Sequence, residues 1–214
     1  MTPVRPAPFP RLRKPLAATL LLTSTLSAAT ALLAQPASLP DAADVDWVAM
    51  KDLTEAQRAK MADGCCGMYV EPKPPVIQGD QSAMHINGIK SNTDSESIVD
   101  LDGPVTIQQG TSWVTAEHGD YDQKRDLITL DGDIHLRRQG ALMIGRHAQV
   151  NRATLTDTLD IASYLLHGPS IRGKAKALVY REDLDVITIN DGVFTRCEPG
   201  DDSWTLSGEQ IVLD

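Results

Sequence analysis

The side chains with the clearest chemical potential in this sequence are three cysteines, Cys65, Cys66 and Cys197. An odd number leaves at least one thiol unpaired within the chain, and adjacent cysteines rarely bond to each other because that geometry is strained. No Cys-x-x-Cys pair is present for zinc binding or dithiol redox chemistry. These residues predict a structural disulfide role. Either Cys65 or Cys66 pairs with Cys197, or the partners lie outside these residues.

Signals for catalysis and metal binding are weak. The five histidines lack ligand spacing, and no serine-hydrolase, zinc-protease or phosphate-loop motif is present. The acidic run at residues 120–126 has carboxylates at the first, third and seventh places of a calcium loop. However, Lys124 occupies a ligand place, and Arg125 replaces the glycine of the sharp bend. A hairpin turn explains this run better, so we expect no catalytic residue, no metal site and no cofactor.

A repeat of short strands must position these residues. Residues 101–110 read LDGPVTIQQG, and residues 130–140 read LDGDIHLRRQG, 29 residues later. A period near 30 residues with turn residues at the same place is typical of stacked β-units that bury a shared interior. Each copy predicts a strand, an Asp-Gly turn and a second strand. We expect short strands to continue from residue 78 to a last strand at residues 204–213.

The region before residue 78 differs in amino-acid composition. Residues 35–50 are rich in Pro, Ala and Asp, which predicts a mobile linker. Residues 51–62 predict a helix, capped by Asp52 or Thr54 and followed by Gly64. Three prolines then keep the segment up to residue 77 extended, so we interpret it as an anchoring segment that carries the cysteine pair.

The first 34 residues are typical of a secretory signal peptide. Four basic residues precede an uncharged stretch at residues 16–33, and small residues near Ala31 and Ala34 suit cleavage. The alternative is a membrane anchor, because the stretch is nearly long enough to span a bilayer. Both interpretations place the remaining residues outside the cytoplasm, and the composition suits a Gram-negative periplasm.

The charge of the remaining chain excludes one class of partner. Residues 35–214 contain 16 basic and 29 acidic residues, a net charge of −13. Such an acidic surface repels phosphate backbones, so we expect no nucleic-acid partner. About 180 residues suffice for one domain of ordinary size. Aromatic residues make up only 4% of the sequence, so the core must be built from aliphatic side chains, which suits strands.

Apolar residues recur at alternating positions along the predicted strands. They form either an ordinary core or an open-sided groove for acyl chains, and periodicity alone cannot separate these two because both need one apolar face per strand. The candidate interior groove residues are Val105, Ile107, Trp113, Ile128, Leu130, Ile134, Leu136, Leu142, Ile144 and Val150.

The order of these features resembles the N-terminal region of the LptD (OstA) family of lipopolysaccharide-assembly outer-membrane proteins. The shared features are the leader, a cysteine shortly after Gly64, and repeats of the type L-x-G-x-V-x-I-x-Q-G with a following Tyr-Asp turn. The most specific feature is the closing pattern T-x-C-x-P-G-x-x-x-W at residues 195–204. The resemblance covers residues from about 60 to 214.

The resemblance implies an all-β fold, a twisted open β-jelly roll of stacked antiparallel rungs over residues 78–214. A signal peptide at residues 1–34 and a linker with a short helix and cysteine anchor at residues 35–77 would precede it. Because the sequence stops in its last strand, we expect these residues to be the front part of a longer chain.

The resemblance also implies a function without catalysis. The domain would receive lipopolysaccharide from a periplasmic bridge protein docked at an edge strand. It would pass the acyl chains through its apolar groove to an outer-membrane barrel, which a plug lipoprotein fills. Cys197 and either Cys65 or Cys66 would bond an adjacent cysteine pair in that barrel, which places the domain at the periplasmic face of the outer membrane.

Other function classes stay open at this stage. The chain could be a structural or adaptor domain that only docks the bridge protein, or a soluble bridge protein itself. A secreted carbohydrate-active enzyme on a β-helix is a third class, which requires carboxylates that meet in a cleft.

Overall fold

By its internal contacts the chain divides into two compact units, residues 1–36 and residues 37–214. A computed structural model describes residues 39–61, 66–88, 90–95, 97–138 and 140–213, all of which belong to the second unit. The predicted signal peptide and Cys65 lie outside the described residues. None of the described helices is long and apolar enough to cross a membrane.

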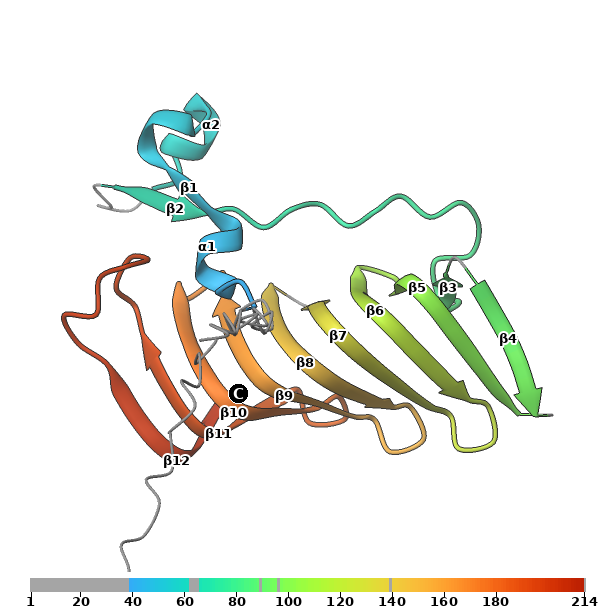
Figure 1. Cartoon of the computed structure of the whole chain (residues 1–214). Coiled ribbons are helices and arrows are strands. Elements are labelled where there is room, and N and C mark those ends of the chain that lie inside the picture. Colours follow the sequence, from blue (N-terminus) through green and yellow to red (C-terminus); the bar gives the residue numbers. More distant parts are fainter. Residues whose placement is uncertain (1–38, 62–65, 89, 96, 139, 214) are drawn as a thin grey trace, which may run out of the picture. The chain divides into compact units, whose positions relative to one another are not determined.

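The second unit is built on one large antiparallel sheet (Figure 1). Its order is β12-β11-β10-β9-β8-β7-β6-β5-β3, and β4 also pairs with β5. The all-β, antiparallel prediction is therefore confirmed. The strands are β3 (His85–Asn87), β4 (Lys90–Ser95), β5 (Ile98–Gln109), β6 (Ser112–Asp122), β7 (Leu127–Arg138), β8 (Ala141–Asn151), β9 (Thr156–Leu166), β10 (Ile171–Arg181), β11 (Val186–Thr195) and β12 (Leu206–Leu213).

β5 and β7 are more than twice as long as the short strands that the sequence predicts there, because the Asp-Gly pairs do not make turns. β5 and β7 run continuously through Gly103 and Gly132, and the pairing register shifts there instead. Gly103 has φ +83° and Gly132 has φ +103°, values that side chains other than glycine rarely adopt. A β-bulge bends a strand without ending it, so the prediction of two short strands in each copy is wrong.

The bends fold the sheet back on itself. Arg138 is paired with Ala141 at one end of β8, and Asp157 is paired with Val150 near its other end. An extended segment of nine residues would separate these ends by roughly 30 Å. The side chains of Arg138 and Asp157 nevertheless lie 2.8 Å apart, so the two ends face each other. We call the strand parts on the two sides of the bends the upper half and the lower half, as they lie in Figure 1.

The core lies between the two halves, on the face that we call the inner face. Leu130, Ile134, Leu159 and Ile189 are at most 2% exposed and belong to one continuous apolar cluster. Leu101, Leu130, Leu159 and Ile189 occupy the same buried position, three residues after the start of β5, β7, β9 and β11, at intervals of 29 to 30 residues. The repeat therefore has four rungs. Only the first two share the Leu-Asp-Gly pattern by which the sequence shows the repeat. This arrangement is the twisted, open jelly-roll-like fold.

The N-terminal part, by which we mean the described residues 39–61 and 66–76, is more ordered than a linker. It contains α1 (Ala42–Asp46), β1 (Trp47–Ala49), a 3-10 turn (Met50–Asp52), α2 (Glu55–Arg58) and β2 (Gly67–Tyr69). Thr54 caps α2 with a capping box, as one predicted cap, but the helix is shorter than residues 51–62. β1 pairs with β2, and α1 packs against the outer face of the large sheet at β8, β9 and β10 (Figure 1).

Candidate functional site

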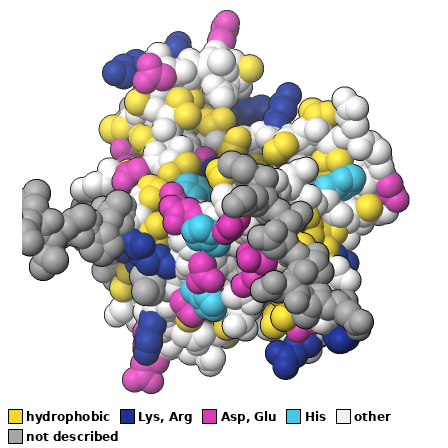
Figure 2. Space-filling model, turned by 45° about the vertical axis from the view of Figure 1, so that its right-hand side comes forward, with side chains coloured by type: hydrophobic (Ala, Val, Ile, Leu, Met, Phe, Trp, Pro, Cys, Tyr) yellow, Lys and Arg dark blue, Asp and Glu magenta, His cyan; other side chains and the backbone are white. Residues whose placement is uncertain are grey.

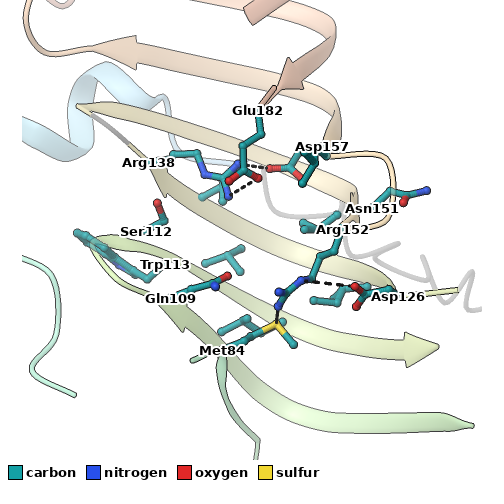
Figure 3. Close-up of a pocket in the computed structure, with 16 residues that line it drawn as sticks. Met84, Gln109, Ser112, Trp113, Asp126, Arg138, Asn151, Arg152, Asp157 and Glu182 are labelled. Atoms are coloured by element: carbon teal, nitrogen blue, oxygen red, sulfur yellow. Dashed lines mark hydrogen bonds and ion pairs between the residues drawn. The ribbon is translucent and has the colours of Figure 1, made fainter. Parts of the chain in front are cut away.

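A pocket opens where the ends of the upper and lower halves approach each other, which we call the mouth (Figure 3). Its volume is about 180 Å³. Ile107, Val114 and Leu136 of the upper half and Ile128 and Val150 of the lower half form its apolar wall. The pocket is thus the point at which the apolar interior meets the solvent.

The candidate groove residues separate into three groups. Ile107, Ile128, Leu136 and Val150 line the mouth pocket, and Trp113 lies at its edge. Val105, Leu130 and Ile134 are buried deeper in the same core and do not line that pocket. At these three positions the interior is tightly packed, whereas the mouth is accessible.

Leu142 and Ile144 are the third group, and their predicted interior location is wrong. Both lie on the outer face, in a second apolar cluster with Leu165 and Ala42 of α1. β8 is apolar on both faces because the N-terminal part covers its outer face, so alternation could not assign these two residues to a side.

Charged residues border the mouth. Arg138, at the end of β7, donates to Asp157 at 2.8 Å and lies 3.7 Å from Glu182. Its guanidinium lies over the ring of Tyr180, 5.0 Å from the centroid. Asp157 is buried, and this burial raises its pKa to about 6; the nearby Glu182 also raises the pKa, while Arg138 opposes the shift.

A second arginine approaches the pocket from the opposite side. Arg152 follows β8 in the turn to β9, and its nearest carboxylate is that of Asp126, 3.8 Å from Nε. Its Nη1 donates to the sulfur of Met84 at 3.0 Å, a weak acceptor. In Figure 3 the guanidinium groups of Arg138 and Arg152 flank the apolar wall from two sides.

The mouth continues beyond Arg138 into a neighbouring hollow of about 490 Å³. Ala141, Met143 and Leu166 line it from the upper half, and Ile187 and Leu213 from the lower half. Arg138 lines both spaces. The charged group at Arg138 therefore stands between two apolar sections of one mouth.

Comparison with known families bears directly on this fold. Residues 85–214 match the family described as LptA/(LptD N-terminal domain) LPS transport protein. The chain belongs to this family. The match covers β3 to β12 and thus every strand of the large sheet.

Relatives of the family are found in several pseudomonads. The LPS-assembly protein LptD of Pseudomonas savastanoi pv. phaseolicola is 34% identical over 178 residues, which are 81% of this chain and 19% of that protein. LptD of Pseudomonas entomophila gives the same identity and coverage. The chain therefore spans about a fifth of the length of the curated relatives it matches. The crystal structure of LptH from Pseudomonas aeruginosa matches with a TM-score of 0.47 and 12% identity, over 60% of this chain and 95% of that chain.

The two described cysteines of this family member, Cys66 and Cys197, lie at the ends of separate elements. Cys66 precedes β2, and its carbonyl oxygen accepts a hydrogen bond from the backbone of Met50 at 2.8 Å. Cys197 follows β11, with its sulfur 4.0 Å from the carbonyl oxygen of Trp204. The backbone of Cys197 is held by Arg172, whose Nε donates to the Cys197 carbonyl at 2.9 Å. The disulfide role of these residues stays a prediction.

Histidine and acidic side chains gather on one surface of the molecule (Figure 2). The strand registers place Asp102, His118, Asp131, His147 and Asp160 in one row across β5 to β9. Nδ1 of His147 lies 2.8 Å from Asp131, and Nδ1 of His118 lies 3.6 Å from Asp102. Within the described ranges, no group of three or more potential ligands could hold a metal ion.

The acidic run at residues 120–126 is a hairpin turn, as predicted. Oδ1 of Asp122 accepts hydrogen bonds from the backbone of Lys124 at 2.9 Å and of Arg125 at 3.1 Å. Tyr121 donates to Asp126 at 3.0 Å. The carboxylates thus fix the backbone of the turn between β6 and β7.

Asp46, Arg137 and His167 form a charged cluster that no sequence pattern predicts. Asp46 of α1 is buried and accepts two hydrogen bonds from Arg137, at 2.6 and 2.8 Å, and one from Nε2 of His167 at 2.9 Å. Nδ1 of His167 lies 2.8 Å from the carbonyl oxygen of Gly140, which can only accept. Both ring nitrogens are therefore donors, and the imidazole is protonated.

The pKa values of this cluster follow from the same contacts. Burial opposes charge on both groups, but the hydrogen bonds outweigh it. The pKa of Asp46 is lowered by His167 and Arg137, and the pKa of His167 is raised by Asp46 and the Gly140 carbonyl. The three side chains are separated by up to 121 residues, so no local pattern in the sequence announces the cluster.

Proposed function

We propose that this chain is a lipopolysaccharide-transport module without catalytic activity, in which acyl chains pass between the two halves of the bent sheet. The observation that carries the proposal is the apolar mouth formed by Ile107, Leu136 and Ile128. Each CH₂ group that leaves water is stabilised by about 0.8 kcal/mol, so a continuous aliphatic path lowers the barrier to movement. A smooth wall of Val, Ile and Leu provides that path without a site of strong binding.

The proposed donor is a periplasmic bridge protein that docks by an edge strand. Two edges are available among the described strands, because β12 pairs only with β11, and β3 and β4 pair only with β5. An unpaired edge presents backbone donors and acceptors that a strand of another protein can complete. Membership of the LPS-transport family supports this mode of docking.

The proposed acceptor lies in the outer membrane. The curated relatives are LPS-assembly proteins of which this chain matches about a fifth, which supports an exported protein associated with the outer membrane at its periplasmic face. A barrel with a plug lipoprotein, and disulfides from Cys197 and Cys65 or Cys66 to that barrel, complete the proposal.

Photocrosslinking tests the transport path. A photoreactive amino acid at Ile107 or Leu136, in the mouth, should capture lipopolysaccharide in cells. The same group at Ile144, on the outer face, or at the exposed Lys176 should not. Equal capture at all four positions, or none at the mouth, contradicts the proposal.

A second candidate function is an adaptor that docks the bridge protein but carries no lipid. The tight packing of Leu130 and Ile134, both 0% exposed, favours it, since a closed core needs no cargo. Lipid capture at Ile107 together with an intact edge would exclude the adaptor; edge-dependent bridge binding without lipid capture would support it.

A further inference from the structure

We propose that Arg138 and Arg152 form a seat for the anionic headgroup of an amphiphile whose acyl chain enters the mouth pocket. This inference rests on the proposed transport function and adds to it a specific recognition site. The ligand class is a single-chain or multi-chain amphiphile with a phosphate or carboxylate group at the border of its apolar part.

The apolar wall defines where the chain would lie. Ile107, Val114 and Leu136 face Ile128 and Val150 across the pocket. The two lining arginines stand at its polar border and come from opposite ends of the strands: Arg138 ends β7 in the upper half, and Arg152 follows β8 in the lower half. An anion between them would be held from both halves while its chain contacts the wall.

Arg138 is held in place before any ligand arrives. The ring of Tyr180 lies under its guanidinium at 5.0 Å, and Asp157 accepts from Nη1 at 2.8 Å. Among the described residues, its Nη2 has only a distant carboxylate, that of Glu182 at 3.7 Å, and the Glu182 side chain is 52% exposed. A phosphate oxygen can replace this loose partner and form a charge-assisted hydrogen bond of ordinary length.

The present partners of Arg152 would compete even more weakly with a ligand. Among the described residues, its guanidinium contacts the thioether of Met84 and the carboxylate of Asp126, which is 3.8 Å away. Thioether sulfur is a weak acceptor, so a phosphate or carboxylate oxygen would be a better partner for the same nitrogen. Buried Asp157 does not compete for this position, because it lies on the Arg138 side of the pocket (Figure 3).

Titration of the full chain with matched C12 probes tests the seat. Dodecyl phosphate and dodecanoate carry the anionic group, dodecyl maltoside carries the same chain without charge, and inorganic phosphate carries the charge without a chain. Measured by calorimetry below the critical micelle concentration, the anionic amphiphiles should bind about tenfold more tightly than the maltoside, the size of one charge-assisted hydrogen bond. Inorganic phosphate alone should bind far more weakly.

Three variants locate the effect. Arg138→Gln and Arg152→Gln should each weaken dodecyl phosphate binding about tenfold and leave dodecyl maltoside binding unchanged. Glu182→Gln removes the loose competitor and should tighten dodecyl phosphate binding. Lys176→Gln, which removes an exposed cation paired at 3.8 Å with Asp191 outside the pocket lining, is the matched control and should change neither.

The outcomes separate this inference from the function on which it rests. If dodecyl maltoside and dodecyl phosphate bind equally and no arginine variant changes the ratio, the headgroup seat is wrong while the apolar path stands. If no amphiphile binds, the proposed transport path itself fails. If Arg138→Gln weakens both ligands equally and Glu182→Gln has no effect, Arg138 only holds the fold, and the seat is again wrong.

Discussion

Asp46 and Arg137 form a bidentate ion pair across 91 residues of chain, with nitrogen–oxygen distances of 2.6 and 2.8 Å. Asp46 belongs to the N-terminal part, and Arg137 belongs to the outer face of β7. The guanidinium also lies 5.7 Å from the ring centroid of Trp113. This pair, with His167, fastens α1 to the sheet and so covers the apolar cluster around Leu142.

Replacement of Asp46 by Asn should therefore release the N-terminal part. Removal of one partner from a buried ion pair costs about 3 kcal/mol or more, and here two cations lose their common carboxylate. Urea unfolding should show this loss, and hydrogen exchange should accelerate at residues 39–50. Asp183→Asn is the control, because Asp183 pairs with Arg181 at 2.9 Å on the surface, where solvent screens the ion pair. Equal effects of the two variants would contradict the assignment.

The His167 contact predicts a pH dependence above neutrality. The pKa of His167 is raised in the folded state, so its stabilisation is complete below the unfolded value and is lost as the pH rises through the folded pKa. The free energy of unfolding should decline above about pH 6.5, the ordinary value for histidine. His167→Gln should remove that decline. A decline of unchanged size in the variant would assign it to another group.

The raised pKa of Asp157 predicts a second pH dependence of stability, in the acidic range. Its folded pKa of about 6 lies above the ordinary aspartate value of 3.8, so the folded state binds the proton more tightly than the unfolded chain. The free energy of unfolding should then fall as the pH rises from about 4 to about 6, by up to about 3 kcal/mol. Asp157→Asn should flatten this slope, whereas Asp183→Asn should preserve it. Thermal unfolding across this range measures both.

The bulge in β7 predicts a cost for any side chain at Gly132. Its φ is +103°, and an added Cβ would lie 2.5 Å from Cβ of Glu117. Gly132→Ala should lower the free energy of unfolding by about 2 kcal/mol, from backbone strain and from the displaced Glu117. Gly168→Ala meets nothing within 4 Å and has no positive φ, so it should be nearly neutral. If both variants unfold alike, the bend does not depend on the glycine.

The closed part of the core should respond to truncation more strongly than the surface. Ile134 is 0% exposed, so Ile134→Ala should cost about 3 to 4 kcal/mol. Ile98→Ala, at a position that is 40% exposed, should cost less than about 1 kcal/mol. A small loss at Ile134 would indicate that the interior is already open in solution.

The strands were predictable because apolar and polar residues alternate along them. This alternation is present wherever one face of the sheet is exposed to solvent. The bends were not predictable. An Asp-Gly pair supplies the positive φ of a hairpin turn and of a bulge equally well. Only the pairing of Leu101 with Gly119 and of Val105 with Ala116 on the same neighbouring strand shows that β5 continues.

The mouth was predictable in part. Ile107, Ile128, Leu136 and Val150 follow from alternation, but their polar partners do not. Arg138 meets Asp157 only because the sheet folds back, and Asp46 meets Arg137 only because α1 returns to the outer face. Both are long-range contacts, which no periodic pattern encodes.

The four rungs at Leu101, Leu130, Leu159 and Ile189 repeat the same strand position along the sheet. Each rung supplies two strands, and neighbouring strands lie about 4.8 Å apart, so one rung extends the sheet by about 10 Å. Each sequence repeat of about 30 residues therefore corresponds to about 10 Å of sheet. Duplication or loss of one unit within a gene would lengthen or shorten the sheet by about 10 Å in a single step, while both edge strands stay the same.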